Sequence, residues 1–503
     1  MFRSGQLDMT PNEELLINVT PREIRVAVIE NGLLQELHIE RSSRRGVLGN
    51  LYKGRVQRVM PGMQAAFVDI GLERAAFLHA SDIVSPANQT FAGESVVPET
   101  RPQPLITSLV HEGQEIVVQV IKDPIGSKGA RLTTEISIPS RYLVLLPDSQ
   151  VVGISSRIDD DNERQRLKQL VQTHADTTGF GYIVRTNAEG IDAAYIEQDI
   201  AYLNRAIAVL RQRAKSHKVG ECIYEDLSLP MRAVRDLLHA RTATVLIDSH
   251  ETFDKVQRFA QQLMPGLSDR IQHYSGERPI FDLYGVEDEI GRALDKQVPL
   301  KSGGYLVFDQ TEAMTSVDIN TGSFLGQKNL EETAYRTNLE AAQSVARQLR
   351  LRNLGGIIII DFIDMHDPEH KRQVLRTLEK GLTNDHVKTT VYDFSPLGLV
   401  EMTRKRTIES LQRQLCEPCP ACSGRGYIKT AETVIYEIFR EVTRAVRQFE
   451  AERVMVMAAP KVVAKITEEE SAAVAELEVF IGKDIRFQPD EQYAQDQFDV
   501  VLS

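Results

Sequence analysis

The sequence contains no tryptophan and only four cysteines among its 503 residues. Four cysteines are too few for a disulfide framework, so we expect a reducing compartment. No apolar run approaches the roughly 20 residues that span a bilayer, and the first residues lack the apolar core of a signal peptide. These absences exclude a disulfide-stabilised secreted scaffold and a membrane-spanning protein. They predict a cytoplasmic protein that has no membrane partner.

The length and the charge limit the remaining possibilities. The chain is too long for a single hydrophobic core, so about three or more domains are expected. The formal net charge of −12 argues against a surface that binds polyanions everywhere. Positive charge is nevertheless concentrated, because residues 41–60 contain six Lys or Arg and no acidic residue. One part of the surface is therefore expected to contact phosphates.

Patterns of apolar and turn residues divide the chain. Alternation over residues 16–40, with Asn31-Gly32 between two apolar runs, predicts a β-hairpin. Short strands punctuated by glycine and proline over residues 48–135 predict a small Greek-key barrel of the OB type, with an inserted loop over residues 91–113. Mixed helical and strand patterns follow. The predicted fold class is therefore multidomain, with α/β and α+β parts.

A βαβ unit is predicted in the middle of the chain. Residues 303–322 have the pattern of a hairpin, and residues 330–353 have that of a long helix ending at an asparagine before two glycines. Residues 357–365, IIIIDFIDM, then predict a strand, and four consecutive isoleucines are typical of a strand that is buried on both faces. The hairpin's second strand, the helix and the parallel strand complete the unit.

Two aspartates, Asp318 and Asp361, lie late in these apparently buried strands, where an unpaired charge is costly. Ligands gather at the carboxyl ends of parallel strands, and Mg²⁺ would relieve the repulsion between two close carboxylates. Asn320 follows on the face of Asp318, where its amide suits a phosphate oxygen. Strand-end aspartates more often cap turns, and Asp309 and Asp364 are interpreted in that way. The three polar groups together favour a metal site.

Aromatic residues of the predicted barrel have two interpretations. Single-stranded nucleic acid stacks on aromatic side chains in a positively charged groove, whereas aromatic residues of small barrels often belong to the core. Tyr52, Phe67 and Phe77 lie on successive predicted strands. The basic residues that accompany them are Lys53, Arg55, Arg58 and Lys128. The mixture of aromatic and basic residues favours an RNA-binding face.

Cys419 and Cys422 have the Cys-x-x-Cys spacing of a zinc knuckle and precede the turn-forming segment SGRG. A structural zinc ion needs four ligands, and neither a second, separate pair of this spacing nor a nearby pair of histidines exists in the sequence. Either the thiols are free, or two chains each contribute a pair. Cys416 could substitute for one ligand or remain unused. The shared site would make the protein a homodimer bridged by zinc.

Five segments, taken in order, resemble the ribonuclease E/G family: LYKGRVQRVMPGMQAAFVDIG, TSVDINTG, LGGIIIIDFIDM, SPLGLVEMTRKR and CPACSGRG. The resemblance runs from about residue 16 to the end of the sequence. The sequence ends at QYAQDQFDVVLS without a long disordered scaffold tail for other enzymes. We therefore expect a chain of the shorter type found in this family.

The resemblance implies a particular domain order. An RNase H-like subdomain, residues 1–47 and 231–293, is interrupted by an S1 barrel, residues 48–135, and by a 5′-sensor, residues 136–230. Three further parts follow in the implied order: a DNase I-like catalytic subdomain, residues 294–415, a zinc link, residues 416–429, and a small C-terminal α+β dimerisation domain, residues 430–503.

The resemblance also implies roles for single residues. Asp318 and Asp361 would hold a catalytic Mg²⁺, and Asn320 would orient the scissile phosphate. Phe67, Phe77 and Lys128 would contact RNA. Arg185 and Thr186 would bind a 5′-monophosphate, with Val144 packing nearby. Cys419 and Cys422 would bind a zinc ion that is shared between two chains. Ser140 departs from the pattern, because the long-tailed relatives have glycine at that place in the sensor.

The implied activity is a Mg²⁺-dependent endoribonuclease that cleaves single-stranded, A/U-rich RNA and favours 5′-monophosphorylated ends. Attack by water would leave a 5′-phosphate and a 3′-hydroxyl, since the 2′-hydroxyl is not the nucleophile. The implied substrates are rRNA precursors, in 5′-end maturation, and mRNA, in decay, with tRNA processing as a related role. Two alternatives are a non-catalytic RNA-binding scaffold with an S1 domain and a nuclease that acts on DNA.

Overall fold

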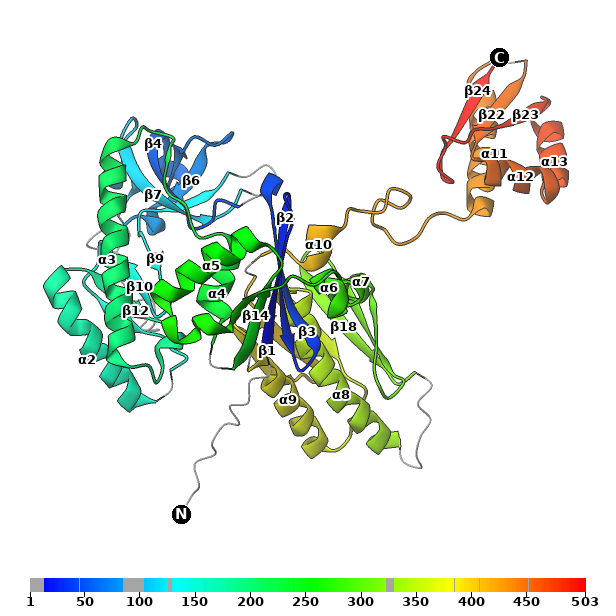
Figure 1. The fold of residues 1–503 in the computed structure, drawn as a ribbon. Helices are drawn as coiled ribbons and strands as arrows, with labels where there is room; N and C mark the ends of the chain where they lie inside the picture. The colour runs from blue at the N-terminus through cyan, green and yellow to red at the C-terminus, as the bar shows by residue number, and fades with distance from the viewer. Residues whose placement is uncertain are drawn as a thin grey trace. The chain divides into compact units, whose positions relative to one another are not determined.

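The computed structural model of the protein describes residues 13–44, 46–84, 104–124, 129–158, 160–239, 241–322, 330–383, 385–406, 408–450 and 452–503 (Figure 1). It divides into two compact units, residues 1–411 and 412–503. A search of the described residues for a helix that could cross a membrane finds none. The finer domain boundaries given above stay predictions.

A five-stranded sheet combines two distant parts of the chain. Its order is β15-β14-β1-β2-β3, with strands Ile271–His273, Thr242–Ile247, Glu13–Val19, Glu23–Glu30 and Leu33–Arg41. The predicted hairpin is confirmed, since β2 and β3 are antiparallel and both Asn31 and Gly32 have positive φ angles. Val26 and Val28 of β2 are buried against Val234 and Val256, which come from a distant part of the chain, and β14 extends the sheet by pairing in parallel with β1. Helices α4 (Leu229–Leu237), α5 (His250–Leu263), α6 (Ile280–Leu283) and α7 (Val286–Leu294) accompany the sheet.

The predicted small barrel is also confirmed. Strands β4 (Leu51–Met60), β5 (Ala65–Asp69), β6 (Ala76–His79), β8 (Arg131–Thr133) and β7 (Glu115–Lys122) pair in this order, and β7 closes back on β4. Strand β13 (Cys222–Tyr224) adds to β4 from outside. Of the predicted loop over residues 91–113, the first part lies outside the described residues and the second contains the short helix α1 (Ile106–Leu109).

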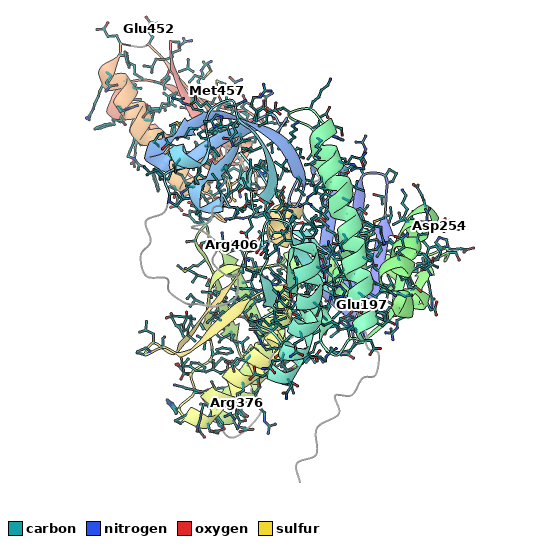
Figure 2. The ribbon with its side chains drawn as sticks, turned by 90° about the vertical axis from the view of Figure 1, so that its left-hand side faces the viewer. Glu197, Asp254, Arg376, Arg406, Glu452 and Met457 are labelled. Atoms are coloured by element: carbon teal, nitrogen blue, oxygen red, sulfur yellow. The ribbon has the colours of Figure 1, made fainter. Side chains whose placement is uncertain are left out.

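A third, four-stranded sheet follows the barrel. Its order is β11-β12-β10-β9, with strands Val152–Ile154, Gly181–Val184, Leu143–Leu146 and Ile138–Pro139. Two long helices, α2 (Asp161–Thr178) and α3 (Ala193–Ser216), pack their apolar sides against it. The acidic side chain of Glu197, on α3, is exposed to solvent (Figure 2).

A six-stranded sheet has the order β16-β17-β18-β19-β21-β20. Its strands are Gln297–Pro299, Tyr305–Gln310, Met314–Asn320, Gly356–Asp361, Leu399–Arg404 and Thr389–Phe394. The predicted βαβ unit is confirmed, because helix α8 (Leu330–Leu351) connects β18 to β19 and the two strands pair in parallel. Helix α9 (Pro368–Leu382) lies beside α8 under the same face of the sheet (Figure 1).

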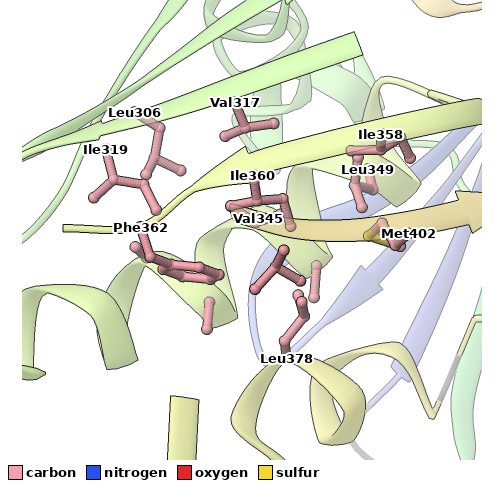
Figure 3. Packing of buried hydrophobic residues seen from close by; sticks show 14 of the residues in the cluster. Leu306, Val317, Ile319, Val345, Leu349, Ile358, Ile360, Phe362, Leu378 and Met402 are labelled. Carbon is pink, nitrogen blue, oxygen red and sulfur yellow. The ribbon is translucent and has the colours of Figure 1, made fainter. Parts of the chain in front are cut away.

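One face of this sheet forms the core with α8 and α9. Val317, Ile358 and Ile360 point towards Val345 and Leu378 of the two helices (Figure 3). All five side chains are buried, and full burial of such a side chain contributes roughly 1.5–3 kcal/mol. This packing fixes the carboxyl ends of β18 and β19 relative to each other.

The other face of the sheet is open, and here the prediction from the four isoleucines was wrong. Ile358 and Ile360 are fully buried, but Ile357 is 48% exposed and Ile359 is partly exposed. Only one face of the sheet is covered by these helices, because α8 and α9 pack on the same side. The strand therefore has one buried and one accessible face, and the accessible face is the one that carries the polar residues of interest.

The second unit contains a three-stranded sheet and three helices that pack around it. The sheet order is β23-β22-β24, with strands Ile485–Pro489, Val454–Ala458 and Phe498–Leu502. Helices α11 (Ala431–Gln448), α12 (Pro460–Glu468) and α13 (Ser471–Ile481) complete it, and its apolar core is separate. The short helix α10 (Leu411–Leu415) spans the boundary between the units.

Candidate active site and RNA-binding surfaces

The structure brings Asp318 and Asp361 together. Strands β18 and β19 pair in parallel, from Met314 opposite Ile357 to Asp318 opposite Asp361. The two aspartates are therefore the last paired residues of the two strands. Neighbouring strands lie about 4.7–4.9 Å apart, and equivalent positions point to the same face. Both aspartates are exposed on the open face, which corrects the expectation that they lie in buried strands. Their charges are therefore accessible to a solvated ligand.

Asn320 joins this pair. Burial alternates strictly along β18, with Thr315, Val317 and Ile319 buried and the residues between them more accessible. Asn320 therefore shares a face with Asp318, and its side-chain amide nitrogen donates a hydrogen bond of 2.9 Å to Asp318 Oδ2. An amide has two N–H donors and one acceptor, so this bond orients the group without using all of its capacity.

The electrostatics of the pair favour a cation. The pKa of the Asp361 carboxyl is raised above its usual value, first by partial burial and then by the negative charges of Asp318 and Asp364. Asp364 thus contributes charge at the site. The N-cap of α9 is Asp367, whose side chain accepts from Glu369 N. A bound cation would remove the repulsion that raises this pKa.

The donor set fits Mg²⁺. Among the described residues, no group of three or more His, Cys, Asp or Glu side chains is arranged to hold a metal ion. Mg²⁺ needs only one or two protein carboxylates, because it retains several waters and takes further oxygens from substrate phosphates. The exposed pair Asp318 and Asp361 supplies that number of carboxylates on an open face.

The structure separates the aromatic residues of the barrel. Tyr52 is 7% exposed and belongs to the barrel core. Phe67 and Phe77 are partly exposed and stand opposite each other on β5 and β6, with ring centroids 6.1 Å apart at 69°. Sequence reasoning had grouped the three, but only this pair forms an accessible aromatic surface. Lys128, the third predicted RNA contact, lies outside the described residues.

The basic stretch beside the barrel is partly neutralised. Arg55 Nη2 lies 3.1 Å from Glu115 Oε1, and Lys53 Nζ lies 3.4 Å from Glu115 Oε2. These ion pairs are held across the pairing of β4 with β7. The local positive potential at Arg55 and Lys53 is therefore weaker than their number suggests.

The residues expected in the 5′-sensor lie at one end of the four-stranded sheet. Arg185 follows β12, and its guanidinium donates 2.6 Å to Ser140 O and lies 2.8 Å from the carboxylate of Asp236. The Thr186 hydroxyl is 3.1 Å from the Ser155 hydroxyl. Val144 pairs with Ile183, two residues before Arg185, so it lies on the same face as Arg185.

Sequence reasoning missed Asp236, the ion-pair partner of Arg185. It lies on α4, in a different part of the chain, and carboxylates on helices are too common for the sequence to mark this one. Ser140, the departure from the family pattern, is fully buried and its hydroxyl lies 2.5 Å from Asp199 Oδ1. Asp199 also accepts from the main-chain N–H groups of Tyr142 and Leu143. The Ser140 side chain therefore points into the interior and leaves its carbonyl oxygen to hold Arg185.

The turn after the cysteine pair directs a main-chain N–H group at the Cys422 sulfur. Gly426 N donates to Cys422 Sγ at 3.3 Å, and this bond, followed by others from the same turn and from the Cys419 thiol, lowers the pKa of Cys422. Cys419 and Cys416 are exposed. N–H groups directed at sulfur favour the thiolate that a zinc ion requires.

Comparison with known proteins agrees with this organisation. A model of the ribonuclease E/G family matches residues 137–407, and a model described as the thioredoxin-like domain of RNase E/G matches residues 418–502. Ribonuclease G of Escherichia coli (strain K12) is 53% identical over 489 residues, which cover 97% of this chain and 99% of that protein. Ribonuclease G of Haemophilus influenzae is 51% identical over 490 residues, with the same two coverages of 97% and 99%.

The chain belongs to the ribonuclease E/G family. Ribonuclease E of Escherichia coli (strain K12) is only 35% identical over 472 residues, which cover 93% of this chain but 44% of that protein. Within the family, the chain is thus more similar to ribonuclease G than to ribonuclease E.

Proposed function

We propose that the chain is a Mg²⁺-dependent endoribonuclease whose active site consists of Asp318, Asn320 and Asp361. Membership of the ribonuclease E/G family supports an endoribonuclease. The observation that carries the proposal of metal dependence is the parallel register that sets Asp318 opposite Asp361 on an open sheet face. Two exposed carboxylates at the ends of adjacent parallel strands have no evident structural use without a cation.

The residues divide the work of hydrolysis. Asp318 and Asp361 would hold the cation, and Asn320, oriented by Asp318, would donate its second N–H to an oxygen of the scissile phosphate. When bound, Mg²⁺ supplies a water of lowered pKa and neutralises negative charge on the phosphoryl oxygens. Attack by water expels the 3′ oxygen and leaves a 5′-phosphate and a 3′-hydroxyl.

The substrate would be single-stranded RNA, rich in A and U. Phe67 and Phe77 offer a surface on which unpaired bases stack, which a duplex cannot use. Arg185 and Thr186 would bind a 5′-monophosphate, and the Arg185 guanidinium is already oriented by Ser140 O and Asp236. Such an enzyme would serve in the cytoplasm in 5′-end maturation of rRNA, in tRNA processing and in mRNA decay.

The functional form would be a homodimer. The pair Cys419 and Cys422 supplies two of the four ligands that a structural zinc ion requires, and a second copy of the chain would supply the other two. The lowered pKa of Cys422 supports this use, because only the thiolate binds the metal.

The test compares wild type with Asp318→Ala, Asp361→Ala and Asp309→Ala. The substrate is a short 5′-monophosphorylated, A/U-rich single-stranded RNA with added Mg²⁺, and the product ends are mapped. Asp309 is the matched control, since it is a carboxylate on the adjacent strand β17 and is paired with Lys296 at 2.6 Å. We expect the first two variants to lose cleavage while they retain RNA binding, and the control to cleave normally.

Other results would favour other functions. RNA binding without cleavage by wild type, or normal cleavage by both site variants, would make the aspartates structural and the protein an RNA-binding scaffold. Equal cleavage of a DNA oligomer of the same sequence would instead indicate a nuclease without sugar preference.

A further inference from the structure

Helix α8 connects the two strands that carry the aspartates, and one of its turns contacts the ends of both strands. Asn338, in its first half, is fully buried although it is polar. A buried polar side chain is costly unless it has hydrogen-bond partners, so its partners show what it holds in place.

The partner of Asn338 is the main chain just beyond Asp361. Asn338 Nδ2 donates to Ile363 O at 2.8 Å, and Ile363 N donates to Asn338 Oδ1 at 3.1 Å. Both polar groups of one peptide residue are thus bound by one amide side chain. Ile363 lies two residues after Asp361, in a segment without regular structure between β19 and α9. Asn338 therefore replaces the strand hydrogen bonds that end at Asp361.

The same part of α8 contacts the segment beside Asn320. A Cβ atom on Gly304 would lie 2.6 Å from Asn320 O and 3.3 Å from Thr337 Cγ2, so the glycine allows helix and strand to approach. Glu340, less than one turn further along α8, accepts from Ser302 N at 3.2 Å. The helix thus contacts both the segment before β17, which lies beside Asn320 O, and the main chain just beyond β19.

We propose that Asn338 is a positioning residue that sets the Asp361 carboxylate relative to Asp318 through the main chain of Ile363. This inference rests on the proposed function of the aspartate pair. An amide is suited to this place because it donates and accepts at once, whereas an aliphatic side chain would leave both groups of Ile363 without a partner. Loss of the clamp would let the end of β19 shift, and groups that orient metal ligands in this way typically change metal affinity or activity by about 10- to 100-fold.

The experiment compares wild type with Asn338→Ala, Asn338→Asp and the control Gln348→Ala. Gln348 is an amide of the same helix, also buried, but it accepts from Arg352 Nε at 2.7 Å, away from the aspartates. For each protein, three properties are measured. They are the cleavage rate over a Mg²⁺ titration, the RNA affinity without added Mg²⁺, and the Tm of thermal unfolding.

For Asn338→Ala we expect half-maximal cleavage at about 10- to 100-fold higher Mg²⁺, a lower kcat and unchanged RNA affinity. Asn338→Asp keeps the acceptor for Ile363 N and should lie between Asn338→Ala and wild type. Gln348→Ala should lower the Tm and keep the wild-type Mg²⁺ dependence, since it removes a stabilising bond only.

A wild-type Mg²⁺ dependence of cleavage in folded Asn338→Ala would overturn the inference. If the alanine variant does not fold, a wild-type Mg²⁺ dependence in Asn338→Asp would overturn it. So would a shift of the half-maximal Mg²⁺ concentration in Gln348→Ala as large as that in Asn338→Ala. Absence of Mg²⁺-dependent cleavage in wild type would instead refute the proposed function itself. The two failures are thereby distinguishable.

Discussion

Phe77→Ala tests whether the aromatic surface of the barrel binds RNA. Phe77 and Leu78 are neighbours on β6, and they point to opposite sides of the strand. Phe77 is partly exposed opposite Phe67, whereas Leu78 is fully buried in the barrel core. The two positions therefore separate RNA binding from stability within one strand.

The magnitudes follow from these environments. Removal of a ring on which one base stacks costs about 1–3 kcal/mol of binding, or about 5- to 150-fold in Kd. The same change removes the edge-to-face contact with Phe67, which costs about 0.5–1.5 kcal/mol of stability. Leu78→Ala removes a core side chain and should destabilise the fold by about 2–5 kcal/mol, without an effect on the affinity of the folded protein.

The assay is fluorescence anisotropy of a labelled single-stranded RNA without added Mg²⁺, combined with unfolding in guanidinium chloride. Both variants are compared with wild type at a temperature where all three are folded. Wild-type affinity in Phe77→Ala would refute the stacking surface. An equal loss of affinity in folded Leu78→Ala would show that barrel stability, and not the ring, controls binding.

Two further predictions concern the metals. The Mg²⁺ concentration at half-maximal cleavage should rise as the pH falls from about 7 to about 5, because the raised pKa of Asp361 lets protons compete with the cation. Asp364→Asn should reduce this rise, because the Asp364 charge is one cause of the raised pKa. Mg²⁺ titrations at each pH check both predictions, and a half-maximal Mg²⁺ concentration that is independent of pH would contradict them. Cys419→Ser or Cys422→Ser should convert a dimer to a monomer in light scattering, because each substitution removes one ligand per chain. A zinc chelator should have the same effect because it removes the metal, and Cys416→Ser serves as the control. A stable dimer without zinc would exclude the shared site.

Local sequence patterns predicted the sheet that carries Asp318 and Asp361 well at the level of elements. Alternation placed Asp318 and Asn320 on one face, and the burial pattern of β18 agrees. The long helix and its glycine end predicted the βαβ connection, which the parallel register confirms. These predictions succeeded because side-chain direction within a strand, and the signals that end a helix, are set by residues close together in the sequence.

Other features depended on which elements pack together. The four isoleucines of β19 are compatible with a strand that is covered on one face and with one that is covered on both. Ile357 is exposed only because α8 and α9 both pack on the other side of the sheet. Likewise, nothing local distinguished Tyr52 from Phe67 and Phe77, because burial depends on which way the barrel closes.

The sequence by itself determined the family, the order of the elements and the identity of the polar residues late in the two strands. The tertiary structure alone decided that Asp318 stands opposite Asp361, that Asp236 holds Arg185, and that Asn338 holds the segment after β19. The physical reason is distance along the chain. Hydrogen bonds and ion pairs between remote residues depend on the packing of whole elements, which no local pattern records.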